Sequence, residues 1–297
     1  MITLSVIIVS YNTKKVFSFC LNSLLENLKK YPFITEIIIV DNGSTDGSLE
    51  IIKKFLVNNQ QSTKLKWKVI FNKKNIGFGK ANNQGVKKSK GRYLLFLNSD
   101  VDLGQMNIKK LLDLFEKDIK IGVITPQLVL SDGRLDKACH RGFPNLWRTF
   151  CYLSYLETIF SRIPLLNKVF GGYHLCHKNF NQIHEIDSPS GAFYLTRKEI
   201  FEEISGFDKD FFMYGEDLDL SWRIKEKGYK IIFYPFEKAT HLKYQSGLEA
   251  SNLKIKRKTK QHFYEAMKIF YQKHYQKRYP FFINRLIFLI IDFLKSR

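Results

Sequence analysis

Short apolar runs rich in isoleucine and valine alternate with amphipathic segments over the first 115 residues, and this alternation constrains the fold more than any other feature. The runs are LSVIIVS from Leu4, ITEIIIVDN from Ile34, WKVIF from Trp67 and RYLLFLNSD from Arg92. The segments between them carry apolar residues at helical spacing. Continuous apolar strands between helices are typical of a parallel sheet covered on both faces. The sequence therefore predicts an α/β fold with a Rossmann-like, mostly parallel sheet flanked by helices.

The second half of the chain departs from this alternation. Residues 136–185 contain scattered aromatic residues, two prolines and the pair Gly171-Gly172, and we expect an irregular insertion or lid there. A strand within SPSGAFYLTR from Ser188, helices over 198–204 and 216–227, and a strand from Tyr229 are expected to follow.

The C-terminal segment is strongly basic. From Leu253 to Arg297 there are twelve lysine and arginine residues against two acidic ones, which is half of the net charge of +20. We expect a helix over 252–275 and then an apolar stretch from Phe281, whose length of about fourteen residues is below the roughly 17–25 of a spanning helix. Such a helical extension would lie on an anionic membrane surface. Packing on the protein's own core, or in a homodimer, is the alternative.

Composition restricts the remaining classes. With 44% hydrophobic and 26% charged residues the chain is globular, and its four cysteines lack CxxC spacing, so reduced thiols in a cytoplasmic protein are expected. The first residues, MITLSVIIVSYN, are expected to form a strand and not a signal peptide. A strong positive charge also fits nucleic-acid binding. We disfavour that class because the excess is concentrated at one end and the loops are acidic.

Polar loops follow three of the apolar runs, and ligands of open parallel sheets bind at the carboxyl ends of strands. Asp41 ends the second run, where a carboxylate can accept from a pyrimidine N3–H or a ribose hydroxyl; a capping loop is the alternative. Asp100 and Asp102 follow the fourth run, and one or two such carboxylates typically hold a phosphate-bound divalent cation. A solvated acidic turn is the alternative there.

Two further segments are ambiguous by themselves. NIGFGKANNQG from Asn75 lacks the third glycine of a dinucleotide fingerprint, and its small residues instead let a helix approach a phosphate or a neighbouring loop. Glu216, Asp217 and Asp219 stand in the first turn of a predicted helix, where the helix dipole alone favours acids.

Six motifs in order nevertheless resemble those of family 2 glycosyltransferases, in particular the rhamnosyltransferase-like subgroup, over residues 3–245. They are VSYN at Val9, VDNGSTDGS at Val40, NIGFGKANNQG at Asn75, LNSDV at Leu97, SGAFYLTR at Ser190 and GFDKDFFMYGEDLDLSWRIKEKG at Gly206. The resemblance implies a GT-A fold, a nucleotide-sugar donor, a divalent cation (Mg2+ or Mn2+) and inversion at the anomeric carbon.

The resemblance also implies a set of site residues. The donor nucleotide would contact Val9, Ser10, Tyr11, Asn12, Asp41, Asn75, Gly77, Asn98 and Ser99. The metal ligands would be Asp100, assisted by Asp102 and His241. Asn98 stands at the first position of the family's D-x-D motif, which leaves one carboxylate fewer for the cation.

On the acceptor side, the resemblance makes Asp217 the base that takes the proton of the acceptor hydroxyl, while Glu216 would orient it or bind the acceptor. The acceptor-side wall would comprise Ser190, Gly191, Ala192 and Trp222. Trp222 lies four residues after Leu218, a spacing that is also typical of a core residue.

We therefore expect a GT-A domain over 1–250, with a nucleotide-sugar-binding half (1–130) and an acceptor-side half (131–250), and a basic amphipathic tail over 251–297. The expected function is an inverting transfer of a sugar, with dTDP-rhamnose as the candidate donor, to a glycan or lipid-linked acceptor. The reaction would serve cell-surface polysaccharide synthesis at the inner face of the cell membrane. A non-catalytic glycan-binding scaffold is the alternative, and a nucleic-acid-binding protein is a weaker one.

Overall fold

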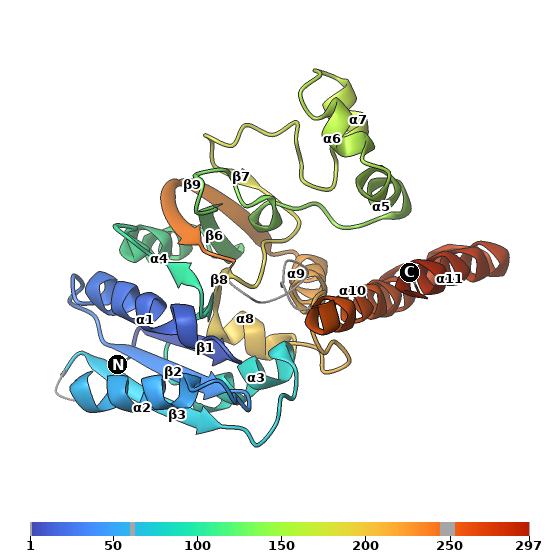
Figure 1. The fold of residues 1–297 in the computed structure, drawn as a ribbon. Helices are drawn as coiled ribbons and strands as arrows, with labels where there is room; N and C mark the ends of the chain where they lie inside the picture. The colour runs from blue at the N-terminus through green and yellow to red at the C-terminus, as the bar shows by residue number, and fades with distance from the viewer. Residues whose placement is uncertain (1, 60–62, 244–252, 297) are drawn as a thin grey trace.

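The computed structural model describes residues 2–59, 63–243 and 253–296, with side chains from 256 onward in the last segment. These residues form one mixed sheet of nine strands in the order β3-β2-β1-β4-β8-β6-β9-β5, with β7 paired to β9. Helices flank the sheet, and the two longest C-terminal helices extend away from it (Figure 1). The predicted α/β sheet flanked by helices is confirmed.

The first four strands are parallel, as the apolar runs predict. They are β1 (Leu4–Ser10), β2 (Thr35–Asp41), β3 (Leu65–Phe71) and β4 (Tyr93–Asn98). Their connections contain α1 (Lys14–Leu28), α2 (Ser48–Asn59) and α3 (Phe78–Lys88). Every residue of β1 and β2 is buried, which is the signature of strands covered on both faces.

Beyond β4 the pairing becomes mixed. The strand β8 (Phe193–Arg197) lies antiparallel between β4 and β6 (Ile121–Val129), and β9 (Lys230–His241) runs parallel to β6. Two short strands, β5 (Val101–Asp102) and β7 (His184–Glu185), pair antiparallel with β9. The parallel part of the sheet is thus its N-terminal half. Three more helices complete this region: α4 (Ile108–Lys117), α8 (Lys198–Glu203) and α9 (Glu216–Glu226).

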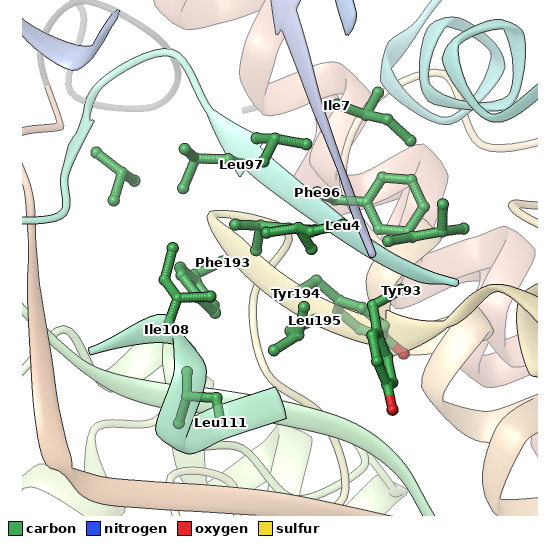
Figure 2. Close-up of a cluster of buried hydrophobic side chains, with 14 of the residues drawn as sticks. Leu4, Ile7, Tyr93, Phe96, Leu97, Ile108, Leu111, Phe193, Tyr194 and Leu195 are labelled. Atoms are coloured by element: carbon green, nitrogen blue, oxygen red, sulfur yellow. The ribbon is translucent and has the colours of Figure 1, made fainter. Parts of the chain in front are cut away.

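One continuous hydrophobic core joins the two halves of the sheet. Figure 2 shows side chains of β1, β4 and β8 meeting those of α4. Phe96 of β4 packs edge to face against Tyr194 of β8, with 6.3 Å between the ring centroids. Because this core spans both halves, residues 2–59 and 63–243 pack together around the strand ends that carry the candidate site.

The insertion expected to be irregular contains short helices. They are η1 (Lys137–Cys139), α5 (Leu146–Leu153), α6 (Leu156–Phe160) and α7 (Leu166–Phe170). Figure 1 places α5, α6 and α7 together, on the same side of the sheet as α11.

The C-terminal segment forms α10 (Leu253–His274), the short η2 (Gln276–Arg278) and α11 (Phe281–Ser296). Two ion pairs, Lys268 Nζ to Asp292 at 2.9 Å and Lys295 Nζ to Glu265 at 2.7 Å, hold α11 on α10. The opposite face of α11 exposes Phe282, Leu286, Leu289 and Phe293, which recur at helical spacing. Across residues 2–59, 63–243 and 253–296, no helix combines the length and the apolar character that crossing a bilayer requires.

Candidate functional site

The strand register places the predicted donor-side residues next to one another. Ser10 at the end of β1 is paired with Asp41 at the end of β2, and Val9 is paired with Asn98 at the end of β4. A hydrogen bond from Asn42 N to Ser10 O (2.8 Å) continues this pairing beyond the strands. Three polar loops therefore meet at one edge of the sheet.

The loop after β2 is locked to the loop after β1. Asn12, in the left-handed region at φ 54°, accepts from Thr45 N through Oδ1 at 2.8 Å, and its own N–H donates to Ser44 Oγ at 3.0 Å. Asp41 Oδ2 accepts from Ser44 N at 3.1 Å, whereas Asp41 Oδ1 is buried without a hydrogen-bond partner among the described residues. Tyr11 leaves 45% of its surface exposed beside this carboxylate-bearing loop.

The glycine-rich segment before α3 lies against the loop that precedes α9. Gly77 has a φ of 95°, and a Cβ at this position would lie 2.7 Å from Phe212 O. Phe78 N donates to the same carbonyl at 2.9 Å, and Asn75 Oδ1 accepts from Gly77 N at 2.9 Å. The small residues are expected to let a helix approach a phosphate or a neighbouring loop, and the structure contains the approach to a neighbouring loop.

Asp217 sits at the start of α9 in a buried ion pair. Its Oδ2 accepts from Arg141 Nη2 at 2.7 Å and from Gly191 N at 3.0 Å. Gly191 is followed by Ala192, whose carbonyl accepts from Asn98 N at 3.0 Å. Asp217 thus lies beside the predicted acceptor-side residues 190–192, and these connect it to the end of β4, two residues before Asp100.

Glu216 is buried beside Asp217 and has a different environment. Its Oε2 has no hydrogen-bond partner among the described residues. Burial, and next to it the negative charge of Asp217, raise the pKa of Glu216 to about 8. At neutral pH Glu216 is therefore mostly protonated, and the single charge of Asp217 is balanced by Arg141.

The structure brings together Asp100, His241 and Asp136. The β5–β9 pairing sets Val101 opposite His241, so that His241 Nε2 lies 3.3 Å from Asp100 Oδ1, and His241 Nδ1 lies 2.7 Å from Asp136 Oδ2. Burial lowers the pKa of His241, but the bonds to Asp100 and Asp136 outweigh it and raise that pKa to about 9.

This group fits a divalent cation with two protein ligands. Asp100 would supply a carboxylate oxygen, and His241 would supply Nε2 after releasing its proton. Asp136, bonded to the other ring nitrogen, would fix the orientation of the imidazole. Asp102 does not join them, because its Oδ1 accepts from Ser23 Oγ at 2.6 Å and from Gly104 N at 2.8 Å. Among the described residues no three acidic, histidine or cysteine side chains are grouped to hold a metal, so phosphate and water oxygens would complete the shell.

Trp222 packs against α10, as a core residue does, and its place on the acceptor-side wall stays a prediction. It is 8% exposed and belongs to a second hydrophobic cluster with Phe211, Leu218 and Phe270 of α10. Its Nε1 donates to Glu226 at 2.6 Å. The i,i+4 spacing from Leu218 places both side chains on the face of α9 that α10 covers. Asp219 forms an ion pair with Arg223 at 2.6 Å, four residues along the same helix, and also contacts His274.

Sequence reasoning missed Arg141 and Asp136. Both lie in the segment read as irregular, and each meets its partner across more than seventy residues of chain. The only available signal is indirect, since a buried carboxylate such as Asp217 requires a cationic partner somewhere.

Solved structures that are similar to this chain show its fold. GalNAc-T7 with UDP, GalNAc and Mn2+ has a TM-score of 0.61 at 17% identity, over 91% of this chain and 50% of that one. TarS 1-349 of S. aureus with UDP-GlcNAc has a TM-score of 0.56 at 20% identity, over 91% of this chain and 65% of that one. The mannosyltransferase PcManGT of Pyrobaculum calidifontis with GDP-Man and Mn2+ has a TM-score of 0.57 at 14% identity, over 91% of this chain and 63% of that one. The fold is the GT-A fold that the motifs imply.

The family follows from the sequence itself. The model for glycosyl transferase family 2 matches residues 5–205, and the chain belongs to this family. A model for glycosyl transferase family group 2 matches residues 171–291. Among curated relatives, the poly-beta-1,6-N-acetyl-D-glucosamine synthase of Staphylococcus aureus (strain COL) is 27% identical over 203 residues, 67% of this chain and 41% of that protein. The synthase of Staphylococcus epidermidis is 25% identical over 233 residues, which are 78% of this chain and 48% of that protein. The chain spans less than half the length of these relatives.

Proposed function

We propose that the protein is an inverting glycosyltransferase that moves a sugar from a nucleotide donor to a hydroxyl of a glycan or lipid-linked acceptor in cell-surface polysaccharide synthesis. The observation that carries the proposal is a set of three buried oxygens without partners among the described residues: Asp41 Oδ1, Ser190 Oγ and Glu216 Oε2. Leaving such an atom unpaired costs about 1–3 kcal/mol, so a polar ligand is the natural partner.

The spacing of these atoms suits a nucleotide sugar. Asp41 ends β2, and Ser190 precedes β8, three strands along the sheet. At about 4.8 Å per strand this is about 14 Å, room for a nucleoside diphosphate and one sugar lying across the strand ends. The base and ribose would lie near Asp41, and the sugar near Glu216 and Asp217.

Asp217 is the proposed base. It would accept the proton of the acceptor hydroxyl while that oxygen bonds to the anomeric carbon and the bond to the diphosphate breaks on the opposite face, which inverts the configuration. Arg141 and Gly191 N hold the carboxylate in place. Glu216, being protonated, would donate to the sugar or acceptor without adding a second negative charge.

Asp100 and His241 would hold the Mg2+ or Mn2+, with Asp136 fixing the imidazole. When bound, the cation supplies positive charge that stabilises the departing diphosphate. Mn2+ in the structures of GalNAc-T7 and PcManGT supports the use of a divalent cation in this fold.

The donor is tested by a screen. The motifs favour dTDP-rhamnose, while the curated relatives and TarS, by their names, favour UDP-GlcNAc as a second candidate. A donor that binds should raise the thermal midpoint in the presence of Mn2+, and NMR of the product reports the anomeric configuration. Retained configuration would refute inversion, and binding without hydrolysis or transfer would favour the non-catalytic glycan-binding scaffold.

We also propose that the exposed face of α11 contacts an anionic membrane surface at the inner face of the cell membrane, and that the protein is cytoplasmic. The cationic excess of the C-terminal segment supports this. Replacing Phe282, Leu286 and Phe293 by serine should abolish co-flotation with phosphatidylglycerol vesicles. These substitutions are preferable to truncation after Pro280, which would uncover α10. A homodimer that the same substitutions dissociate would refute the membrane contact.

A further inference from the structure

A cavity of about 430 Å³ lies between α5, the start of α9, α10 and α11. Its lining is almost wholly apolar and includes Leu146, Leu153, Leu218, Phe263, Met267 and Ile290. The volume is within the range of about 300–1,000 Å³ typical of small-molecule sites. Protein interiors are otherwise close-packed, so an apolar space of this size favours an apolar occupant.

Two parts of the cavity wall connect directly to the candidate catalytic site. Gly215 and Leu218 line the cavity on either side of Glu216 and Asp217 in sequence. Gly215 has a φ of 77°, and a Cβ there would lie 3.0 Å from Phe211 Cε1 and 3.2 Å from Ala266 Cβ of α10, so the absence of a side chain lets the start of α9 pack closely on α10. On the other wall, the cavity-lining residue Tyr173 accepts a hydrogen bond through its carbonyl oxygen from Gly142 N at 2.7 Å. Gly142 follows Arg141, the partner of Asp217.

The cavity reaches the surface through apolar side chains. Phe150 and Leu153 of α5 and Ile290 of α11 line it and are 55%, 36% and 47% exposed. Beyond them α6 and α7 expose Ile159 and Val169. The opening is therefore lined by exposed apolar side chains, which suit a hydrocarbon chain better than a soluble sugar or peptide.

The positive charge near the cavity favours an anionic lipid over a second copy of this chain as the occupant. Lys256 and Lys260 of α10 precede Phe263 and Met267 by seven residues, so they continue the cavity-lining face of the helix toward its N-terminus. A second copy of this chain would bring two strongly basic segments together, whereas an anionic lipid head would be attracted.

We propose that this cavity binds the hydrocarbon chain of a lipid-linked acceptor whose head carries phosphate, with the polar end directed along the start of α9 toward Asp217. The inference rests on the proposed function, because it names the class of acceptor for the same site. The lysines of α10 would contact the phosphate, and the attacking hydroxyl would lie beyond it.

The test uses farnesyl diphosphate as a probe, titrated calorimetrically into the full chain without vesicles. Ile290→Trp fills the cavity and should weaken binding at least about tenfold, the equivalent of about 1.4 kcal/mol. Leu289→Trp is the matched control, because Leu289 is the exposed neighbour that does not line the cavity. Leu153→Trp repeats the test from the α5 wall should the first variant fold poorly. Sodium pyrophosphate should bind far more weakly than the probe.

Equal binding of the probe to wild type, Ile290→Trp and Leu153→Trp would overturn the cavity assignment, as would pyrophosphate binding as tightly as the probe. A wild-type dimer in sedimentation that Ile290→Trp dissociates would also overturn it, in favour of a second copy as the occupant. Donor hydrolysis by the wild-type protein is measured separately. If hydrolysis occurs while the probe fails, the glycosyltransferase proposal survives and the cavity proposal does not.

Discussion

Glu216→Gln should change how the stability of the protein depends on pH. The pKa of Glu216 rises from 4.5 to about 8 on folding, so between these values the folded chain holds a proton that the unfolded chain releases. The stabilising contribution of the protonated group is complete below about pH 4.5 and is lost as pH rises toward 8. Each pH unit in this window is worth about 1.4 kcal/mol, and the whole window on the order of 4–5 kcal/mol.

Glutamine keeps the shape of the side chain and cannot ionise, so the variant lacks this pH dependence. The unfolding free energy of wild type minus that of Glu216→Gln should therefore fall from pH 5 to pH 8 in urea titrations followed by circular dichroism. The buried amide adds an offset that does not vary with pH. Glu50→Gln, at an exposed position of α2, is the control and should give a constant difference. A constant difference for Glu216→Gln as well would refute the assignment of a buried, protonated Glu216.

Asp217→Asn should lower turnover by about 10²–10⁴-fold with little change in donor affinity, because it removes the base on the acceptor side; normal turnover in a single-turnover assay would exclude Asp217 as the base. Asp100→Asn should raise the Mn2+ concentration for half-maximal transfer about tenfold or more. Asp102→Asn should not raise it, because Asp102 is bonded to Ser23 and Gly104. Equal effects of the two variants in a metal titration would contradict the proposed ligands. Gly77→Ala should lower the unfolding free energy by about 1–3 kcal/mol, since φ is 95° and the new Cβ would meet Phe212 O at 2.7 Å; an unchanged thermal midpoint would count against this.

The N-terminal half of the sheet can be predicted from sequence because its signals are local. Apolar runs and the polar turns after them fix where β1, β2 and β4 end, and the parallel register then places Ser10, Asp41 and Asn98 side by side. The strand β6 cannot be predicted in this way, because it contains Pro126, next to which the register against β9 shifts. The antiparallel insertion of β8 depends on contacts between distant segments, which periodicity does not report.

The same limit applies to the site. The acid pair and the DxD-like turn are visible as motifs, but the partners of Asp217 and His241 come from a segment without periodicity. Trp222 shows the reverse case. Its spacing from Leu218 correctly indicates a shared helix face, yet nothing local tells whether that face meets a ligand or α10.

The position of β8 determines how far acceptor and donor specificity can be exchanged between relatives. This strand comes late in the chain but fills the slot between β4 and β6, so a fragment ending near residue 130 would expose an unpaired edge of β4. Chimaeric enzymes that graft a foreign C-terminal half onto this N-terminal half must therefore preserve the five-residue match from Phe193 to Arg197. Exchanging only the segment from α5 to α7, with a junction on each side of it, would leave that match and the contacts of Asp136 and Arg141 untouched.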